Sequence, residues 1–142
     1  MNAPSAAVVA AAAFVWLGMV LAISFLEAPL KFRAPGMTVP LGLGIGRVVF
    51  RAFNKIEALL AATVLVALAI GAPRWQITAP AAASALLLAV QLAAIRPALN
   101  RRSDRVLAGE DVPRSRAHLV YVAFEVAKAA ALLTLGLSAV SA

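Results

Sequence analysis

Four long apolar blocks, separated by charged or Pro/Gly-rich stretches, constrain the fold of this chain more than any other feature. The blocks cover residues 6–26, 47–72, 77–95 and 116–140. A bilayer core about 30 Å thick is crossed by roughly 20 predominantly apolar helical residues, and each block is close to that length. The pattern predicts an all-α four-transmembrane-helix bundle that forms one integral membrane domain over residues 1–142.

The composition supports insertion into a membrane. Of the 142 residues, 63% are hydrophobic, and the mean hydropathy is +0.94, whereas a soluble domain is about half apolar. A net charge of +7 can indicate a nucleic-acid partner. Here the basic residues fall between the apolar blocks, where they determine membrane topology. We therefore predict contacts with membrane lipids and no nucleic acid.

The residue inventory excludes several chemistries. The chain has no cysteine, and its single histidine is His118. Thiol catalysis, disulfides and multi-histidine metal or haem sites within one chain are therefore excluded, and we predict neither a metal nor a cofactor. No Lys or Arg precedes Lys31, so the first block lacks the basic start of a signal peptide and is expected to be retained as a helix.

The second block needs a polar extension to cross a membrane. Its purely apolar part, Ala58–Ala72, has only 15 residues. At about 1.5 Å per residue this stretch cannot cross a core of about 30 Å. We therefore expect the helix to begin near Arg47, with its polar first turns in the headgroup region.

Two prolines are expected to end helices, because proline lacks a backbone N–H and clashes with the preceding turn. Pro29 follows the first span and Pro97 follows the third. Long loops are then expected over Ala28–Gly46 and Ala98–Ser115. In the first loop, three glycines are expected to permit a tight return of the chain: Gly42, Gly44 and Gly46.

The positive charges predict the orientation. The first long loop and the helix start after it carry five Lys or Arg residues, the second long loop and its flanks carry six, and the short middle turn carries only Arg74. Loops rich in Lys and Arg stay in the cytoplasm. We therefore expect a multi-pass protein of the cell (plasma or inner) membrane, with both termini outside and both long loops in the cytoplasm.

The two halves of the chain share a weak repeat. Pro29 precedes Glu57 by 28 residues, and Pro97 precedes Glu125 by the same interval. Each half then reads helix, proline, basic loop, and helix with an early glutamate. The pattern predicts two helical hairpins of the same orientation, as in parallel membrane repeats, with both carboxylates at similar depth in the cytoplasmic half of the membrane.

Charged residues inside the last block are candidates for a functional site. A charged side chain near the centre of a membrane helix costs at least ~2.5–3.5 kcal/mol on insertion scales, which draws attention to Glu125 and Lys128. Residues three or four apart lie on one helix face. That spacing adds His118 and Tyr121 to the same stripe.

The second helix carries a matching polar set, Arg51, Asn54 and Glu57. Polar stripes in a membrane bundle turn toward one another rather than toward lipid. We therefore predict a ligand-binding cleft between the second and fourth helices, with Glu57 and Glu125 as its acidic centre and Lys128 as the counter-charge. The structural alternative is that these charges only neutralise one another and fix the helix packing.

Five short motifs follow in order along the chain. They are WLG at Trp16–Gly18, EAPLKF at Glu27–Phe32, GRVVFRAFN at Gly46–Asn54, IRPALNRRSD at Ile95–Asp104 and RAHL at Arg116–Leu119. In this order they resemble the small four-helix membrane proteins of unknown function related to transmembrane protein 205. The resemblance covers nearly the whole chain, implies the four-helix fold and supplies no established reaction. The Glu125–Lys128 pair is not matched to the pattern of that family.

The start of the second helix resembles another family. Residues Arg51–Glu57 read RAxNxxE, which is similar to the RAxxNxxE motif that opens the second helix of microsomal glutathione transferases and leukotriene synthases. The resemblance implies a membrane enzyme that combines glutathione with a lipophilic substrate. The motif here is one residue shorter, which rotates Asn54 and Glu57 by about 100° from the geometry of that family.

Three functions follow from these patterns. The first is a non-enzymatic protein that binds or translocates a small ion or amphiphile through the polar cleft. The second is an enzyme of the glutathione-transferase type, in which Arg47 and Arg51 hold the anion and Tyr121 or Arg51 activates it. The third is an accessory subunit of a larger membrane complex. Because a bundle this small leaves a narrow interior, we also expect a homo-oligomer.

Overall fold

The computed structural model describes all residues, 1–142, and is 86% helical with no strand. Its elements are, in chain order, α1 (Ala3–Val20), the π-helix η1 (Leu21–Glu27), α2 (Ala28–Leu30), the 3₁₀-helix η2 (Lys31–Arg33), α3 (Val39–Gly71), α4 (Trp75–Val90), the π-helix η3 (Gln91–Ile95), α5 (Arg96–Leu107) and α6 (Arg116–Val140).

Neighbouring elements continue one another, so that the chain forms four rods: Ala3–Arg33, Val39–Gly71, Trp75–Leu107 and Arg116–Val140. Each rod is long and apolar enough to cross a membrane. The predicted all-α bundle of four transmembrane helices is confirmed, and the chain is a multi-pass membrane protein.

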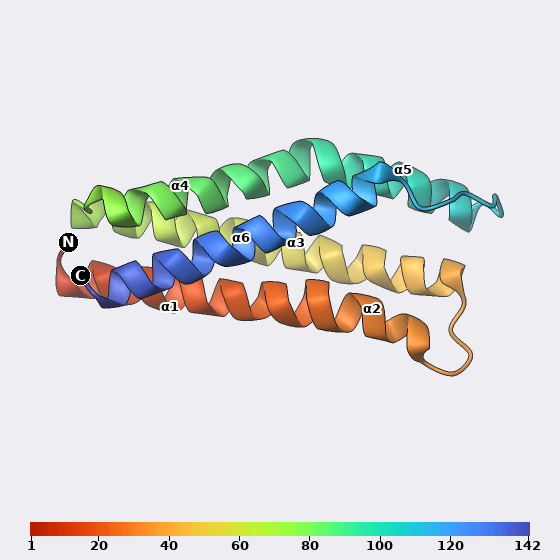
Figure 1. Cartoon of the computed structure of the whole chain (residues 1–142), viewed down its shortest axis with the longest axis horizontal. Coiled ribbons are helices and arrows are strands. Elements are labelled where there is room, and N and C mark those ends of the chain that lie inside the picture. The colour runs from red at the N-terminus through yellow and green to blue at the C-terminus, as the bar shows by residue number, and fades with distance from the viewer.

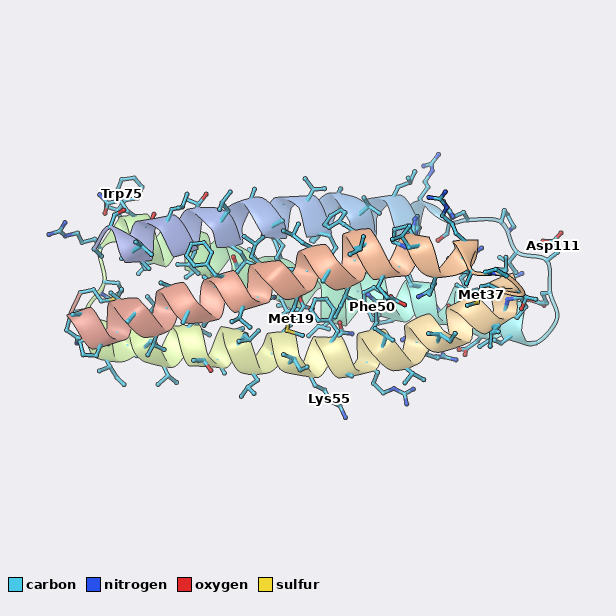
Figure 2. The ribbon with its side chains drawn as sticks, turned by 90° about the horizontal axis from the view of Figure 1, so that it is seen from below. Met19, Met37, Phe50, Lys55, Trp75 and Asp111 are labelled. Atoms are coloured by element: carbon cyan, nitrogen blue, oxygen red, sulfur yellow. The ribbon has the colours of Figure 1, made fainter.

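The rods run antiparallel to their neighbours in the chain, so the bundle has two distinct ends (Figure 1). Both chain termini and the turn before Trp75 lie at one end, which we call the terminal end. The residues 34–38, α5 and the residues 108–115 lie at the other, which we call the basic end. Figure 2 shows Trp75 at the terminal end and both Met37 and Asp111 at the basic end.

The surface of the bundle along its length is mainly apolar. Leu59 is 67% exposed, Ile70 is 70% exposed and Leu119 is 68% exposed. Side chains of this kind are normally buried in a soluble protein, and contiguous exposure of many of them marks a surface that another apolar medium covers. The interior holds mostly smaller side chains around Trp16, which is 1% exposed.

The helices are longer than the sequence led us to expect. Pro29 does not end the first helix, which continues to Arg33. Pro97 does not end the third, which continues to Leu107. The expected long loops shrink to residues 34–38 and 108–115. At about 1.5 Å per residue a rod of 33 residues is about 50 Å long, roughly 20 Å more than a bilayer core.

The two π-helices explain how the prolines are accommodated. The N–H of Ala28 bonds the carbonyl of Ile23, and the N–H of Arg96 bonds that of Gln91, which is five residues back rather than four. Each π-helix ends two residues before a proline, Pro29 or Pro97. The wider turn absorbs the missing N–H and the ring, so the helix passes through instead of breaking.

The internal repeat extends to the pattern of burial. Pro29 and Pro97 lie 68 residues apart, as do Glu57 and Glu125. The same interval relates the last residues of η1 and η3. It also pairs buried positions of the first half with buried positions of the second: Val9 with Ile77, Ala13 with Ala81, Trp16 with Ser84, Val20 with Leu88, Phe53 with Tyr121, Val64 with Leu132, Ala67 with Leu135 and Gly71 with Ala139.

The glycine series does not form the tight return that we expected, because it lies inside α3. A Cβ atom added to Gly42 would lie 2.2 Å from the ring of Phe32, and one added to Gly46 would lie 2.9 Å from Lys31 Nζ. Gly44 faces open space. Two of the glycines therefore allow η2 to approach α3 closely at the basic end.

Gly71 offers a test of the packing at the terminal end. A Cβ atom there would lie 2.8 Å from Ser5 Cβ and 2.7 Å from Met1 Cγ, so α1 and α3 would have to move apart. We expect Gly71→Ala to lower the free energy of unfolding by about 1–3 kcal/mol, measured by denaturant or thermal unfolding in detergent. Gly18→Ala, at an exposed helical position with nothing within 4 Å, is the control and should be neutral or slightly stabilising.

Candidate functional site

A buried ammonium group lies at the centre of the bundle. Lys128 Nζ is 2.7 Å from Glu125 Oε1 and donates to Gln91 Oε1 at 2.8 Å. It also bonds Glu57 Oε1. All four residues are at most 3% exposed. The ammonium therefore joins α3, η3 and α6.

Further hydrogen bonds bring the first rod into this network. Trp16 Nε1 donates to Glu57 Oε1 at 2.9 Å. Ser24 Oγ donates to Glu125 Oε2 at 2.5 Å and lies 3.3 Å from the hydroxyl of Tyr121. Gln91 Nε2 donates to Glu125 Oε1 at 2.7 Å. We call these seven residues the polar network: Trp16, Ser24, Glu57, Gln91, Tyr121, Glu125 and Lys128.

The local helix geometry explains why these side chains meet. Tyr121, Glu125 and Lys128 follow spacings of four and three residues, which place them on one face of α6. Ser24 lies in η1 and Gln91 is the first residue of η3. Each π-helix thus supplies a polar partner for Glu125, and π-bulges recur at functional sites in helices.

The charges of the network do not cancel. Two carboxylates meet one ammonium, so one negative charge is left when both glutamates are ionised. A charge inside a membrane bundle is unfavourable unless it is paired and hydrogen-bonded. The network therefore has room for one more positive charge, and a proton on either carboxyl group would neutralise it.

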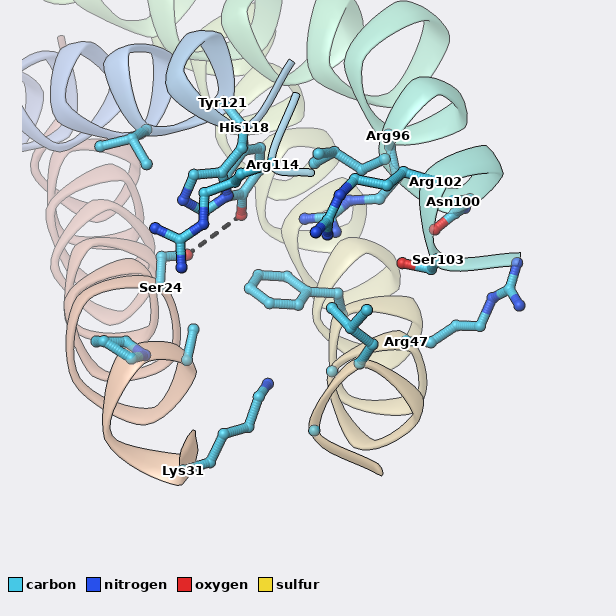
Figure 3. Close-up of a pocket in the computed structure, with 18 of the residues that line it drawn as sticks. Ser24, Lys31, Arg47, Arg96, Asn100, Arg102, Ser103, Arg114, His118 and Tyr121 are labelled. Carbon is cyan, nitrogen blue, oxygen red and sulfur yellow. Dashed lines mark hydrogen bonds between the residues drawn. The ribbon is translucent and has the colours of Figure 1, made fainter. Parts of the chain in front are cut away.

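A cavity of about 470 Å³ opens next to the network, toward the basic end. Its inner wall includes Ser24, Tyr121 and Glu125, which belong to the polar network. Figure 3 shows side chains from the first, second, third and fourth rods around this space. Aromatic and aliphatic side chains form part of the wall, namely Phe25, Phe32, Leu43, Phe50, Leu99 and Val122.

The cavity wall is strongly basic. Five cationic side chains line it: Lys31, Arg47, Arg96, Arg102 and Arg114. His118 lies among them (Figure 3), and the acidic side chain in the wall is Glu125, which shares the Lys128 ammonium with Glu57. The cavity therefore offers a positive potential to whatever enters it.

The structure brings together part of the set of residues predicted as the site. Glu57, Glu125, Lys128 and Tyr121 meet in the polar network. His118 lines the cavity instead.

The remaining predicted residues lie outside the network. Asn54 is partly buried and makes no side-chain hydrogen bond to it. Arg51 is exposed on α3, on the side where Lys55, one helical turn later, points away from the bundle (Figure 2). The basic group proposed for glutathione on Arg47 and Arg51 is therefore divided, since only Arg47 lines the cavity.

Three members of the polar network were not predicted as site residues, Trp16, Ser24 and Gln91, and neither was Arg96 of the cavity wall. Gln91 had a usable signal, because an amide in the middle of an apolar span faces other helices rather than lipid. Trp16 had none, since an indole in a span is usually a packing residue. Arg96 directly precedes Pro97, and Ser24 lies five residues before Pro29, two prolines that we expected to end the helices.

Comparison with protein-family models, with curated proteins and with solved structures finds no match for this chain. The two family resemblances drawn from its motifs therefore stay predictions. The assignment of a function rests on the polar network and the cavity alone.

Removal of the buried ammonium tests the network. We expect Lys128→Met to lower the free energy of unfolding by about 3–5 kcal/mol, because two buried carboxylates lose their counter-charge. Combining it with Glu57→Gln should recover part of the loss. The measurement is denaturant or thermal unfolding in detergent at neutral pH.

Lys55→Met is the matched control. Lys55 is an exposed lysine on α3 that points away from the bundle (Figure 2), so its loss should change the stability by no more than about 0.5 kcal/mol. Equal stability of Lys128→Met and Lys55→Met would show that the network contributes nothing to folding.

Proposed function

We propose that this chain is a non-enzymatic membrane protein that binds a small ion inside the bundle, and that the ion is a proton held by the polar network. The observation that carries the proposal is the unequal charge of the network, two buried carboxylates around one ammonium. A proton neutralises the excess charge without needing space for coordination.

The hydrogen bonds favour a proton over a metal cation. Both oxygens of Glu125 already accept hydrogen bonds, from Gln91 and Ser24. Glu57 Oε1 accepts from both Trp16 and Lys128. A metal ion requires several free oxygen ligands, whereas a proton needs only one lone pair, and Glu57 Oε2 accepts no hydrogen bond in the network.

Access to the network is one-sided in this conformation. The cavity reaches Glu125 from the basic end. Toward the terminal end, the buried residues that follow are mostly apolar, among them Val64, Leu132 and Leu135, and the buried hydroxyl of Ser84 donates to the carbonyl of Pro80 in its own helix. Such an arrangement suits a binding site loaded from one side, and translocation would require a second conformation that opens the other side.

The direction of loading follows from the proposed topology. The sequence stretches 31–55 and 96–116, which lead into and out of the basic end, carry eleven of the thirteen Lys and Arg residues, which favours placement of that end in the cytoplasm. Protons would then reach Glu125 from the cytoplasmic side of the plasma or inner membrane. We further propose a homo-oligomer, in which the exposed apolar faces of the rods contact one another as well as lipid.

The enzyme hypothesis is kept as the second candidate, because Arg47 and the hydroxyl-bearing Tyr121 line the same cavity. In that case an anionic cosubstrate and a lipophilic substrate would share the space. A glutathione-conjugation assay on the purified protein tests it. We expect no conjugation of glutathione and no stabilisation of the protein by it. Measurable turnover would favour the enzyme hypothesis.

Substitution of the carboxyl groups tests proton binding. We expect pH-difference infrared spectra of the purified protein to show the carbonyl stretch of a buried protonated carboxyl group. Glu125→Gln or Glu57→Gln should abolish that band while leaving membrane insertion intact, since the amide keeps the shape of the side chain and cannot titrate.

Glu110→Gln serves as the control, because Glu110 is exposed and pairs with Arg105 at the surface. It should leave the band unchanged. A band that persists in both Glu57→Gln and Glu125→Gln, or that is absent from the unaltered protein at every pH, would contradict the proposal.

A further inference from the structure

We propose that the cavity at the basic end is a second site, which binds an anionic phosphate or carboxylate group carried by an amphiphile, with Arg96 as the residue that holds the anion. The site adjoins the polar network and shares Glu125 with it, but its positive charges belong to other residues. Four features of the cavity support this site: the charge of its wall, the unpaired donors of Arg96, the apolar part of the wall and the depth of Arg96 in the membrane.

Most of the positive charge in the cavity wall is not paired with a carboxylate. Among the five cations of the wall, Lys31 pairs with Glu27 at 3.7 Å, and Arg47 pairs with Asp104 at 2.6 Å. The other three have no carboxylate partner. Arg102 donates to two backbone carbonyls, at 2.9 Å and 3.0 Å, which keeps its charge uncompensated.

Arg96 has buried hydrogen-bond donors without a partner. Its guanidinium lies against two aromatic rings, 4.2 Å from the centroid of Phe50 and 4.6 Å from that of Tyr121. Its Nε and Nη2 atoms are buried and have no hydrogen-bond partner. Buried donors are nearly always satisfied in folded proteins, so this pair of N–H groups indicates a missing acceptor.

The chemistry of that acceptor follows from the guanidinium. Nε and Nη2 form one edge of a planar fork, which matches two oxygens of a carboxylate or phosphate. The two rings, which lie edge to face, hold the guanidinium in place between them. Arg114 lies beside the same space (Figure 3) and has no hydrogen-bonded or carboxylate partner of its own, so it can supply a second charge to the same anion.

Part of the cavity wall is apolar. Phe25, Phe32 and Leu43 line the cavity, and they offer no hydrogen bonds to an inorganic ion. A ligand with an acyl or alkyl chain would bury apolar area against them, which stabilises binding.

Arg96 lies at a depth in the membrane where lipid headgroups can reach it. Arg96 lies 21 residues after Trp75, which is about 31 Å along the helix and close to the thickness of a bilayer core of about 30 Å. The guanidinium is thus at the level of lipid headgroups when Trp75 lies at the opposite interface. A lipid headgroup and an amphiphile from the aqueous side can both reach that level.

The test is a titration of the purified protein in neutral maltoside micelles. The probes are hexyl phosphate and inorganic phosphate, and calorimetry measures the binding of each. We expect saturable binding of hexyl phosphate, and Arg96→Gln should weaken it by about tenfold or more, because a charge-assisted hydrogen bond contributes about 1.5–3 kcal/mol. Arg101→Gln, which removes an exposed arginine of α5 outside the cavity, should leave the affinity unchanged.

The outcomes separate the sources of the ligand. Tighter binding of hexyl phosphate than of inorganic phosphate assigns an amphiphile. Retention of phosphatidylglycerol over phosphatidylcholine by the unaltered protein in native mass spectrometry, lost in Arg96→Gln, then assigns a membrane lipid as its source. No saturable binding of hexyl phosphate, or equal binding of both phosphates, would overturn the proposal.

A folding defect must be distinguished from a binding defect. Thermal unfolding in detergent identifies a variant that fails to fold, and Arg96→Lys and Arg114→Gln then replace Arg96→Gln. Arg96→Lys keeps the charge but loses the fork, so it should weaken binding of hexyl phosphate. Unchanged affinity in both replacement variants would also overturn the proposal. Glu57 and Glu125 remain unaltered and the pH is the same throughout, so a loss of binding in these variants cannot come from a loss of the titratable groups of the network.

Discussion

The contacts of the Lys128 ammonium determine how the four helices fit together. In lipid, apolar helices gain little from associating with one another, so close packing and polar contacts decide their register. Lys128 meets a glutamate from α3, an amide from η3 and a glutamate from its own helix. Trp16 extends the contact to α1. A shift of any rod by one residue would leave a charge or a donor unpaired in a medium without water.

The asymmetry of the two halves creates the site. In the repeat, Phe53 occupies the position equivalent to Tyr121, and Leu60 the position equivalent to Lys128. An exact repeat would hold two carboxylates and no ammonium, or two copies of each. Because only the second half carries the lysine, the two glutamates share a single counter-charge. The excess negative charge that we assign to a proton follows from this departure from symmetry.

The sequence predicted the fold well and the site in part, for reasons that can be stated for individual residues. Hydropathy identifies spans, and helical spacing placed Glu125, Lys128 and Tyr121 on one face. Neither pattern indicates whether a helix can continue past a proline. Pro29 and Pro97 were therefore predicted to end helices, although the π-helices η1 and η3 accommodate both. Trp16 and Ser24 have partners 41 and 101 residues away, and no local pattern carries that information. The positive charges predicted topology, but not that five of them surround one cavity.

Glu125 connects the two proposed sites, since it belongs to the network and to the cavity wall. An anion held by Arg96 would place negative charge near that carboxylate, and a like charge nearby favours the protonated form of a carboxyl group. By linkage, a proton on Glu125 would favour binding of the anion to the same degree. Occupation of both sites would then bring a proton and an anionic group into the bundle together, which leaves the membrane interior with less uncompensated charge than either ligand alone. The position of Glu125 at the junction is therefore what would make the two sites act as one.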